Sequence, residues 1–279
     1  MWVAVNKVVR LTMSHLRHEK QTYELRSLIF EVRKKLKAGW SEEVYHQALL
    51  QLFQDKDLPV QSKPRRAISH RGVQVHLFEC DIIVRDLIIL ELKALPYTKL
   101  NSVHQAQLFH YLKCWGKDLG LLVNFGGTKA DIQRLVWDEP KFEVEETYDL
   151  IKPHLNDTDR EELRQIREVI LNVGRQYGLG YPGIMYRQII ALELNYRGFI
   201  CQSDVKVPVT WNGSSLREDG IDQLLVNQRH LLNVRALLDF PSSYEFGRTK
   251  NYLQHLGGRF GFVVNFGKKQ LQIYGVRGD

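Results

Sequence analysis

Glu91 and Lys93 stand two residues apart in an otherwise apolar run, LIILELKAL at 87–95. Side chains of a strand alternate between its two faces, so this spacing places the carboxylate and the ammonium on one face. Asp81 lies on the preceding segment, across a tight turn. A two-residue turn pairs Asp81 with Leu90, whereas a three-residue turn or a bulge sets it opposite Glu91. In either register two carboxylates and a lysine converge.

Such a charged cluster is costly on an apolar sheet unless its members are paired or hold a metal ion. Carboxylate oxygens suit Mg²⁺ or Mn²⁺, which keep several waters and accept phosphate oxygens. The simpler alternative is an ion pair, in which Lys93 neutralises Asp81 or Glu91 at the sheet edge. The D-x9-E-x-K spacing alone leaves both interpretations open.

Two further pairs of polar side chains accompany this cluster. Gln107 and Tyr111 are four residues apart, and Glu42 and Tyr45 are three apart, so each pair shares one face of a predicted helix. Either pair alone is typical of ordinary surface or core. Their occurrence together with the two carboxylates and the lysine indicates an active site.

The chain contains an internal repeat at a shift of 141 residues, in which LLVNFG at 121–126 returns as FVVNFG at 262–267. A repeat of this length is a domain and not a solenoid unit. We therefore expect two domains, at 20–137 and 159–279, joined by an acidic, proline-containing linker at 138–158. Duplication also suggests a pseudo-twofold pairing of the two copies.

Each copy is expected to run helix, helix, β-meander, helix, strand. The first helix of each copy has apolar residues at the 3.6-residue period of a helix that buries one face. In the first copy the predicted helices are 22–37, 41–55 and 101–115, and the predicted strands are 58–69, 73–84, 87–93 and 119–125. This order predicts an α/β or α+β fold with helices packed on a mixed sheet.

The composition is that of an ordinary soluble globular protein, and its positive charge favours an anionic partner. The 279 residues carry a net charge of +7, with a pI near 9.2, and clustered basic residues release counterions when they meet phosphates. Three scattered cysteines give no indication of a disulfide framework or a zinc site. No apolar stretch reaches the roughly 18 residues of a membrane helix. We expect an intracellular protein, in the cytoplasm, nucleoid or nucleus. The first 18 residues contain no acid and are either an organelle transit peptide or an element packed on the first domain.

These residues resemble the PD-(D/E)XK nuclease superfamily. The G-x-x-E-x-x-Y signature at 39–45, with ELKAL at 91–95, HQAQLFHYLK at 104–113 and LLVNFG, is similar to the GxxExxY family within it. Gln107-x-x-x-Tyr111 also resembles the motif that follows the active site of RecB-like nucleases. The likeness covers 25–137 and implies tandem restriction-endonuclease-like domains, each with a mixed central sheet flanked by helices.

The resemblance implies a role for each matching position. Lys93 would orient or activate the attacking water and stabilise the charge that builds on the phosphate, while Gln107 and Tyr111 would steady Lys93 or grip the phosphate. A divalent ion near the scissile phosphate lowers the pKa of the water and offsets oxyanion charge. The implied ligands of Mg²⁺ or Mn²⁺ are Asp81, Glu91, the Leu92 carbonyl and Glu42. The implied catalytic residues are Glu42, Asp81, Glu91, Lys93, Gln107 and Tyr111.

The second copy departs from this pattern. One residue is inserted between Asp222 and Asn233, and of the acids only Asp222 remains. A single carboxylate beside two arginines would hold Mg²⁺ poorly, so we expect this copy to be non-catalytic, although its arginines could bind phosphate bidentately. The residues at the positions of Glu42, Glu91, Lys93 and Gln107 are Gly183, Asn233, Arg235 and Arg248.

The sequence therefore predicts a metal-dependent nuclease that acts on nucleic acid, DNA rather than RNA, through its N-terminal domain. The alternative is a catalytically silent nuclease fold that binds nucleic acid or serves as a scaffold in a repair or defence complex, with a protein partner on the second domain. A basic run around the first hairpin either contacts a nucleic-acid backbone or is a solvated turn. Its members are Lys63, Arg65, Arg66 and Arg71.

Overall fold

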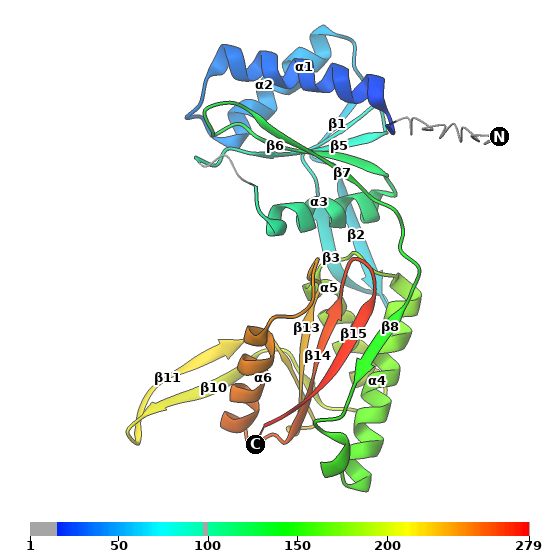
Figure 1. Ribbon diagram of the computed structural model, residues 1–279, viewed down its shortest axis with the longest axis vertical. Helices are drawn as coiled ribbons and strands as arrows, with labels where there is room; N and C mark the ends of the chain where they lie inside the picture. The colour runs from blue at the N-terminus through cyan, green and yellow to red at the C-terminus, as the bar shows by residue number, and fades with distance from the viewer. Residues whose placement is uncertain (1–15, 97–99, 279) are drawn as a thin grey trace, which may run out of the picture.

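The computed structural model describes residues 16–96 and 100–278 and consists of two repeats of one α/β architecture (Figure 1). Most of the acid-free N-terminal segment lies outside the described residues. Among the described helices, none combines the length and the apolarity needed to cross a membrane.

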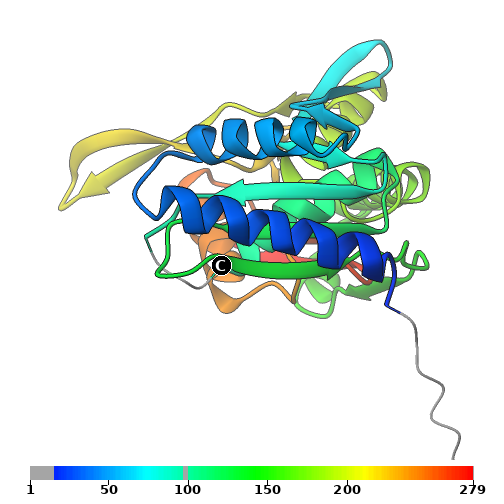
Figure 2. The same ribbon diagram turned by 90° about the horizontal axis from the view of Figure 1, so that it is seen from above.

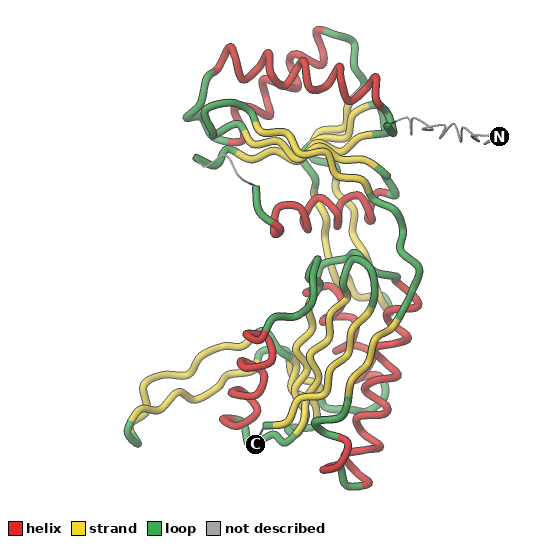
Figure 3. Tube along the Cα trace, in the orientation of Figure 1, coloured by secondary structure: helices red, strands yellow, loops and turns green. Residues whose placement is uncertain are grey.

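The first repeat is a mixed five-stranded sheet with helices on both faces (Figures 1 and 3). Helices α1 (Glu19–Leu36) and α2 (Glu42–Asp55) cover one face, and α3 (Ser102–Trp115) covers the other. The strand order is β1-β4-β5-β6-β7, in which only β5 and β6 pair in parallel. The strands are β1 (Val60–Ser62), β4 (Ile82–Val84), β5 (Ile88–Lys93), β6 (Leu119–Asn124) and β7 (Asp131–Val136).

Two apolar layers hold the sheet in place. Leu90 and Leu92 of β5 pack with α1 and α2, whereas Ile89, on the opposite face of the same strand, packs with α3. Tyr45 is fully buried in the first layer and stacks on Phe125, with ring centroids 4.4 Å apart. Glu91 and Lys93 therefore face α3, because they alternate with the leucines.

The predicted meander does not stay in one sheet. Each of its first two strands breaks, at Lys63 and at Asp81, and the distal halves form a separate hairpin of β2 (Arg65–His70) and β3 (Val73–Glu79). Lys63 has the left-handed φ of 45° and precedes Pro64, which has no N–H for a ladder, so the strand turns out of the sheet here. The expectation of continuous strands at 58–69 and 73–84 is thus wrong.

The second repeat has the same plan with a six-stranded sheet, in the order β8-β15-β14-β13-β12-β9. Strand β8 (Val144–Thr147) comes from the segment predicted as a linker and pairs in parallel with β15 (Leu271–Arg277), and a 3₁₀ turn, η1 (Lys152–His154), follows it. The helices are α4 (Asp157–Tyr177), α5 (Gly183–Tyr196) and α6 (Ser243–His255). The other strands are β9 (Cys201–Gln202), β12 (Leu224–Val226), β13 (His230–Arg235) and β14 (Phe260–Phe266), with a projecting hairpin of β10 (Val205–Trp211) and β11 (Ser214–Ile221).

The two repeats meet through the β2–β3 hairpin, which extends from the first sheet onto α5 of the second repeat (Figure 1). Val75 and Phe78 of the hairpin belong to the apolar core of the second repeat. At the hairpin tip, His70 lies 2.7 Å from the Tyr177 hydroxyl and 2.6 Å from a Glu193 oxygen. Within the described residues the β10–β11 hairpin makes no matching contact with the first repeat, and it points away from that repeat (Figures 1 and 2). The pairing is therefore not pseudo-twofold.

Candidate active site

Strands β4 and β5 bring Asp81, Glu91 and Lys93 together. Residues 85–87 form a three-residue turn between the two strands, and Ile82 pairs with Leu90. This register places Asp81 beside Glu91. Asp81 Oδ2 accepts a hydrogen bond from the Leu92 backbone N–H at 2.7 Å. Lys93 Nζ donates to Glu91 Oε1 at 2.6 Å. The three side chains converge at the point where the hairpin leaves the sheet.

Glu91 is the most constrained acid of the cluster. It is 2% exposed, and its Oε2 atom has no hydrogen-bond partner among the described residues. Burial, and then the neighbouring Asp81 carboxylate, raises the pKa of Glu91 to about 8 despite the opposing effect of Lys93. Burial disfavours the ammonium of Lys93, but the carboxylates around it outweigh this and raise its pKa. If Glu91 and Asp81 were both ionised, the single ammonium of Lys93 could not neutralise both charges.

Glu42 supplies the third carboxylate. It is the first residue of α2 and is half-buried. Burial raises the pKa of Glu42; the Lys93 ammonium lowers this pKa and the Asp81 carboxylate raises it. Tyr45, three residues later, does not join it, because its ring lies in the core and its hydroxyl donates to the Lys37 carbonyl at 2.7 Å. Of the pair Glu42 and Tyr45, only Glu42 therefore lies at the site, although we expected the two side chains to share one face of the helix.

Gln107 and Tyr111 lie on α3 and bond to each other. Gln107 Nε2 donates to the Tyr111 hydroxyl at 3.0 Å. Burial raises the pKa of Tyr111, and the Glu91 carboxylate adds to the shift. Gln107 and Tyr111 are thus a hydrogen-bonded pair on α3, and the effect of Glu91 on the pKa of Tyr111 places this pair near the acids of β4 and β5.

Sequence reasoning missed the support behind Asp81. His46 is buried, and its Nε2 lies 3.3 Å from both the Asp81 carbonyl oxygen and the Ser62 hydroxyl. The backbone N–H of Lys63 donates to the same carbonyl at 2.8 Å. The second repeat has a comparable contact, because Arg187, at the position of His46, donates to the Asp222 carbonyl; the sequence gives no signal of either contact.

The comparisons with known proteins agree with this geometry. The sequence model of the PD-(D/E)XK nuclease superfamily matches residues 19–135 and again residues 160–276. The chain belongs to the PD-(D/E)XK nuclease superfamily. Curated proteins give no match. A solved structure titled "Crystal structure of SSO0001" is 21% identical over 44% of this chain and 62% of its own, at a TM-score of 0.28, which is too low to carry an argument.

Membership establishes tandem PD-(D/E)XK-like domains and a nuclease-type phosphodiesterase fold, and nucleases of this superfamily typically use divalent metal ions. The donor chemistry of the first-domain site suits such an ion, although among the described residues the three ligand atoms that lie within 4.8 Å of one another are those of Asp159, Glu162 and His230. Three carboxylates surround one ammonium, and the unpartnered Oε2 of Glu91 is an oxygen of the kind that Mg²⁺ and Mn²⁺ prefer.

The second PD-(D/E)XK-like domain has amides where the first has acids. Leu224 pairs with Leu232, so the inserted residue puts Gln223, and not Asp222, beside Asn233. Both amides are fully buried, and both donate to the Thr249 hydroxyl. The alignment of Asp222 with Asp81 is therefore off by one residue at the sheet.

Asp222 is displaced into an internal ion-pair network. Its two oxygens bind Arg235 at 2.6 Å and Arg248, while Arg235 also binds Glu245 at 3.0 Å. The pKa of Asp222 is lowered because these arginines outweigh its burial. Both guanidinium groups are already held by carboxylates of their own domain, so they are not the open phosphate clamp that the sequence suggested.

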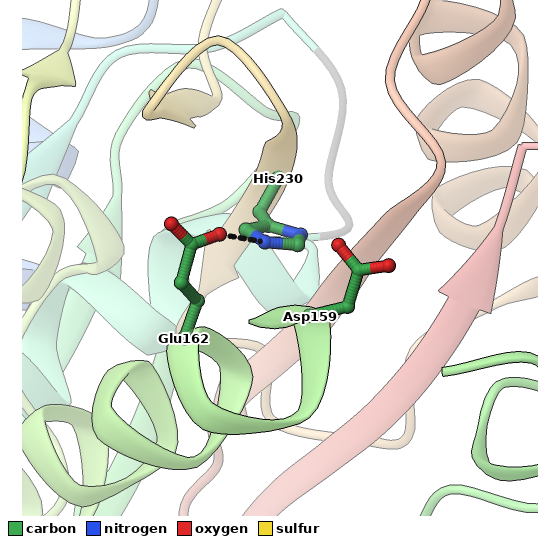
Figure 4. Close-up of side chains that lie close together, drawn as sticks. All are labelled: Asp159, Glu162 and His230. Carbon is green, nitrogen blue, oxygen red and sulfur yellow. Dashed lines mark hydrogen bonds and ion pairs between the residues drawn. The ribbon is translucent and has the colours of Figure 1, made fainter. Parts of the chain in front are cut away.

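A second acidic cluster lies at the start of α4 and consists of Asp159, Glu162 and His230 (Figure 4). Arg229 binds Asp159 at 2.5 Å, and His230 Nε2 lies 2.8 Å from Glu162. The guanidinium group already neutralises the buried acid, as expected of a structural ion pair. This cluster differs from the site in the first domain, where the carboxylates outnumber the cations.

Proposed function

We propose that the protein is a nuclease of the GxxExxY type that hydrolyses phosphodiester bonds of DNA in its first domain, with Mg²⁺ or Mn²⁺ as cofactor. One observation carries the proposal: Glu91 is buried beside Asp81 with one oxygen unpartnered and a pKa raised to about 8. An acid this costly to ionise calls for a cation in addition to Lys93. The net charge of +7 supports a nucleic-acid substrate.

The chain's own residues have distinct tasks in this mechanism. Asp81, Glu91, Glu42 and the Leu92 carbonyl would hold the ion, which supplies a water of lowered pKa and a counter-charge for the phosphate oxygens. Lys93, held by its hydrogen bond to Glu91, would stabilise the charge that develops on the phosphate and orient the attacking water. The Gln107–Tyr111 pair offers donors for a second phosphate oxygen.

The second domain, within boundaries of about 159–279, would be a non-catalytic partner. At the place that corresponds to Asp81 and Glu91, its described residues are buried amides, and the nearby Asp222 is held by two arginines. Two members of the basic run around the first hairpin form ion pairs within the molecule, Lys63 with Glu43 and Arg71 with Glu193. We propose that the second domain positions the first through the hairpin.

The test compares matched substitutions in the two domains. Purified protein with Mg²⁺ or Mn²⁺ should cut labelled single- or double-stranded DNA, and Lys93→Ala and Glu91→Gln should each reduce the rate at least 100-fold or so, by loss of transition-state stabilisation. Arg235→Ala, at the counterpart of Lys93, should leave the rate unchanged. Thermal unfolding of each variant shows whether it is folded.

Two results would contradict the proposal. If the folded Glu91→Gln variant still cuts DNA at the normal rate, the active site does not include Glu91 of the first domain. Salt-dependent DNA binding with no hydrolysis under any divalent ion would favour the alternative of a silent nuclease fold.

A further inference from the structure

The two projecting hairpins have the same construction. Both turn through two left-handed residues, Arg71 and Gly72 at φ of 49° and 77° in the first and Asn212 and Gly213 at 48° and 76° in the second. Each also has a bulge at the same place, two residues before the end of its first strand. The shift of 141 residues therefore matches them position by position, with His70 at the place of Trp211.

One face of the first hairpin is buried against the second domain. Val75 and His70 are buried there, and His70 lies between Tyr177 at the end of α4 and Glu193 of α5. Next to it, the guanidinium of Arg71 stacks 3.6 Å above the ring of Tyr196. This contact is polar at the tip and apolar along the strand.

The matching face of the second hairpin is uncovered and is apolar towards its tip, whereas Asp219 stands at the position of Phe78. Trp211 and Leu216, at the positions of His70 and Val75, are 68% and 63% exposed in the described structure. The hairpin extends away from both sheets in two views (Figures 1 and 2). Large exposed side chains that lie together on one face mark an interaction site.

The corresponding receiving surface lies at the other end of the molecule, on α1 and α2. Leu36 and Leu52 stand at the positions of Tyr177 and Glu193. Trp40, at the position of Tyr181, is 53% exposed, and its indole N–H already donates to the Leu36 carbonyl, which leaves the ring free for apolar contact. The two partners of His70 are thus replaced by leucines where His70 is replaced by tryptophan, while Tyr196, the partner of Arg71, is replaced by Asp55.

We propose that the occupant of this surface is a second copy of the chain: the β10–β11 hairpin of one molecule docks on α1 and α2 of the next. The contact inside the molecule is the template, since the first hairpin docks on α4 and α5 in this way. Such a contact is heterologous, because the two surfaces differ, and it propagates into a ring or an open filament. It is independent of the proposed nuclease activity.

The charge of the hairpin argues for protein and against nucleic acid. The hairpin, 205–221, contains two cations, Lys206 and Arg217, against two anions, Glu218 and Asp219, for a net charge of zero. A surface that binds phosphates requires an excess of basic residues.

Sedimentation velocity over a range of protein concentrations provides the first test. The weight-average mass should rise above that of the monomer as the concentration increases, and Trp211→Ser should weaken association by roughly tenfold or more, as expected for a buried tryptophan anchor. Phe240→Ser is the matched control, because Phe240 is 66% exposed but lies outside the hairpin. Its association should equal that of the unmodified protein.

Cross-linking tests the geometry. Asn212→Cys in one preparation and Asp55→Cys in another reproduce the Arg71–Tyr196 contact between molecules, and both carry Cys201→Ser to remove the accessible native thiol. A short bis-maleimide should join the mixed preparations, and it should not join Asn212→Cys to Lys20→Cys, at the exposed start of α1.

Three outcomes would overturn the proposal. The first is a monomer at every concentration, and the second is association that Trp211→Ser leaves intact. The third is a loss of binding to labelled duplex DNA in Trp211→Ser while its association stays unchanged, which would assign the hairpin to nucleic acid.

Discussion

His110 makes a contact between the two domains that should depend on pH. It lies on α3, and its Nδ1 donates to the Gly180 carbonyl of the second domain at 2.9 Å. Burial lowers the pKa of His110 to about 4, only partly offset by this hydrogen bond. The imidazole is therefore neutral in the folded protein throughout the physiological range.

The sign and size of the effect follow from linkage. In the unfolded chain the histidine has its ordinary pKa of 6.5, so between about pH 6.5 and pH 4 the unfolded state binds more protons than the folded state. The free energy of unfolding should thus be constant above pH 6.5 and fall as the pH drops. A difference of about 2.5 units at 1.36 kcal/mol each amounts to about 3 kcal/mol over this window.

Urea unfolding at several pH values measures this contribution. His110→Gln can still donate to the Gly180 carbonyl but cannot titrate, so subtracting its curve from that of the unmodified protein isolates the histidine. The difference should be flat from pH 8 to about 6.5 and then decrease by about 3 kcal/mol towards pH 4. A difference that is flat throughout would refute the account of a buried neutral imidazole.

Three other perturbations have defined outcomes. Gly180→Ala should destabilise the protein more than Gly39→Ala in thermal unfolding: both have a left-handed φ, worth roughly 1–3 kcal/mol of strain, but only at Gly180 would the added carbon collide with the Trp137 ring. Phe78→Ala should cost about 3–5 kcal/mol in urea unfolding, because it empties the contact between the domains; an unchanged midpoint would show that the hairpin is not anchored there. Mn²⁺ at tenfold its Kd should stabilise the protein by about 1.4 kcal/mol in calorimetry, an effect that Glu91→Gln should remove.

The helices and the polarity of β5 could be predicted because they depend on local periodicity. Leu25, Ile29 and Val32 share one face of α1 at helical spacing, and they are buried as that pattern requires. Alternation alone places Glu91 and Lys93 on one face of their strand, and they form an ion pair there. These features need no knowledge of distant parts of the chain.

The remaining features depend on tertiary contacts that the sequence does not show. The first hairpin leaves its sheet at Lys63 and Pro64, and Pro64 marks that break in the sequence, but no local pattern shows that the second domain receives Phe78. The edge strand Asp131–Val136 was not predicted, since all its residues are half-buried and show no alternation. The one-residue offset at Gln223 was located only by the strand register, because an insertion at a bend disturbs no period.

The inserted residue beside Asp222 determines how many changes would be needed to restore a pair of acids in the second domain. Replacing Asn233 by glutamate would set one new acid next to an amide, while Asp222 would stay out of register in the grip of two arginines. Reversion would require a deletion and several substitutions at once, and each intermediate would bury an uncompensated charge. Restoring a pair of acids at this place would therefore take a change of strand register as well as changes of side chain.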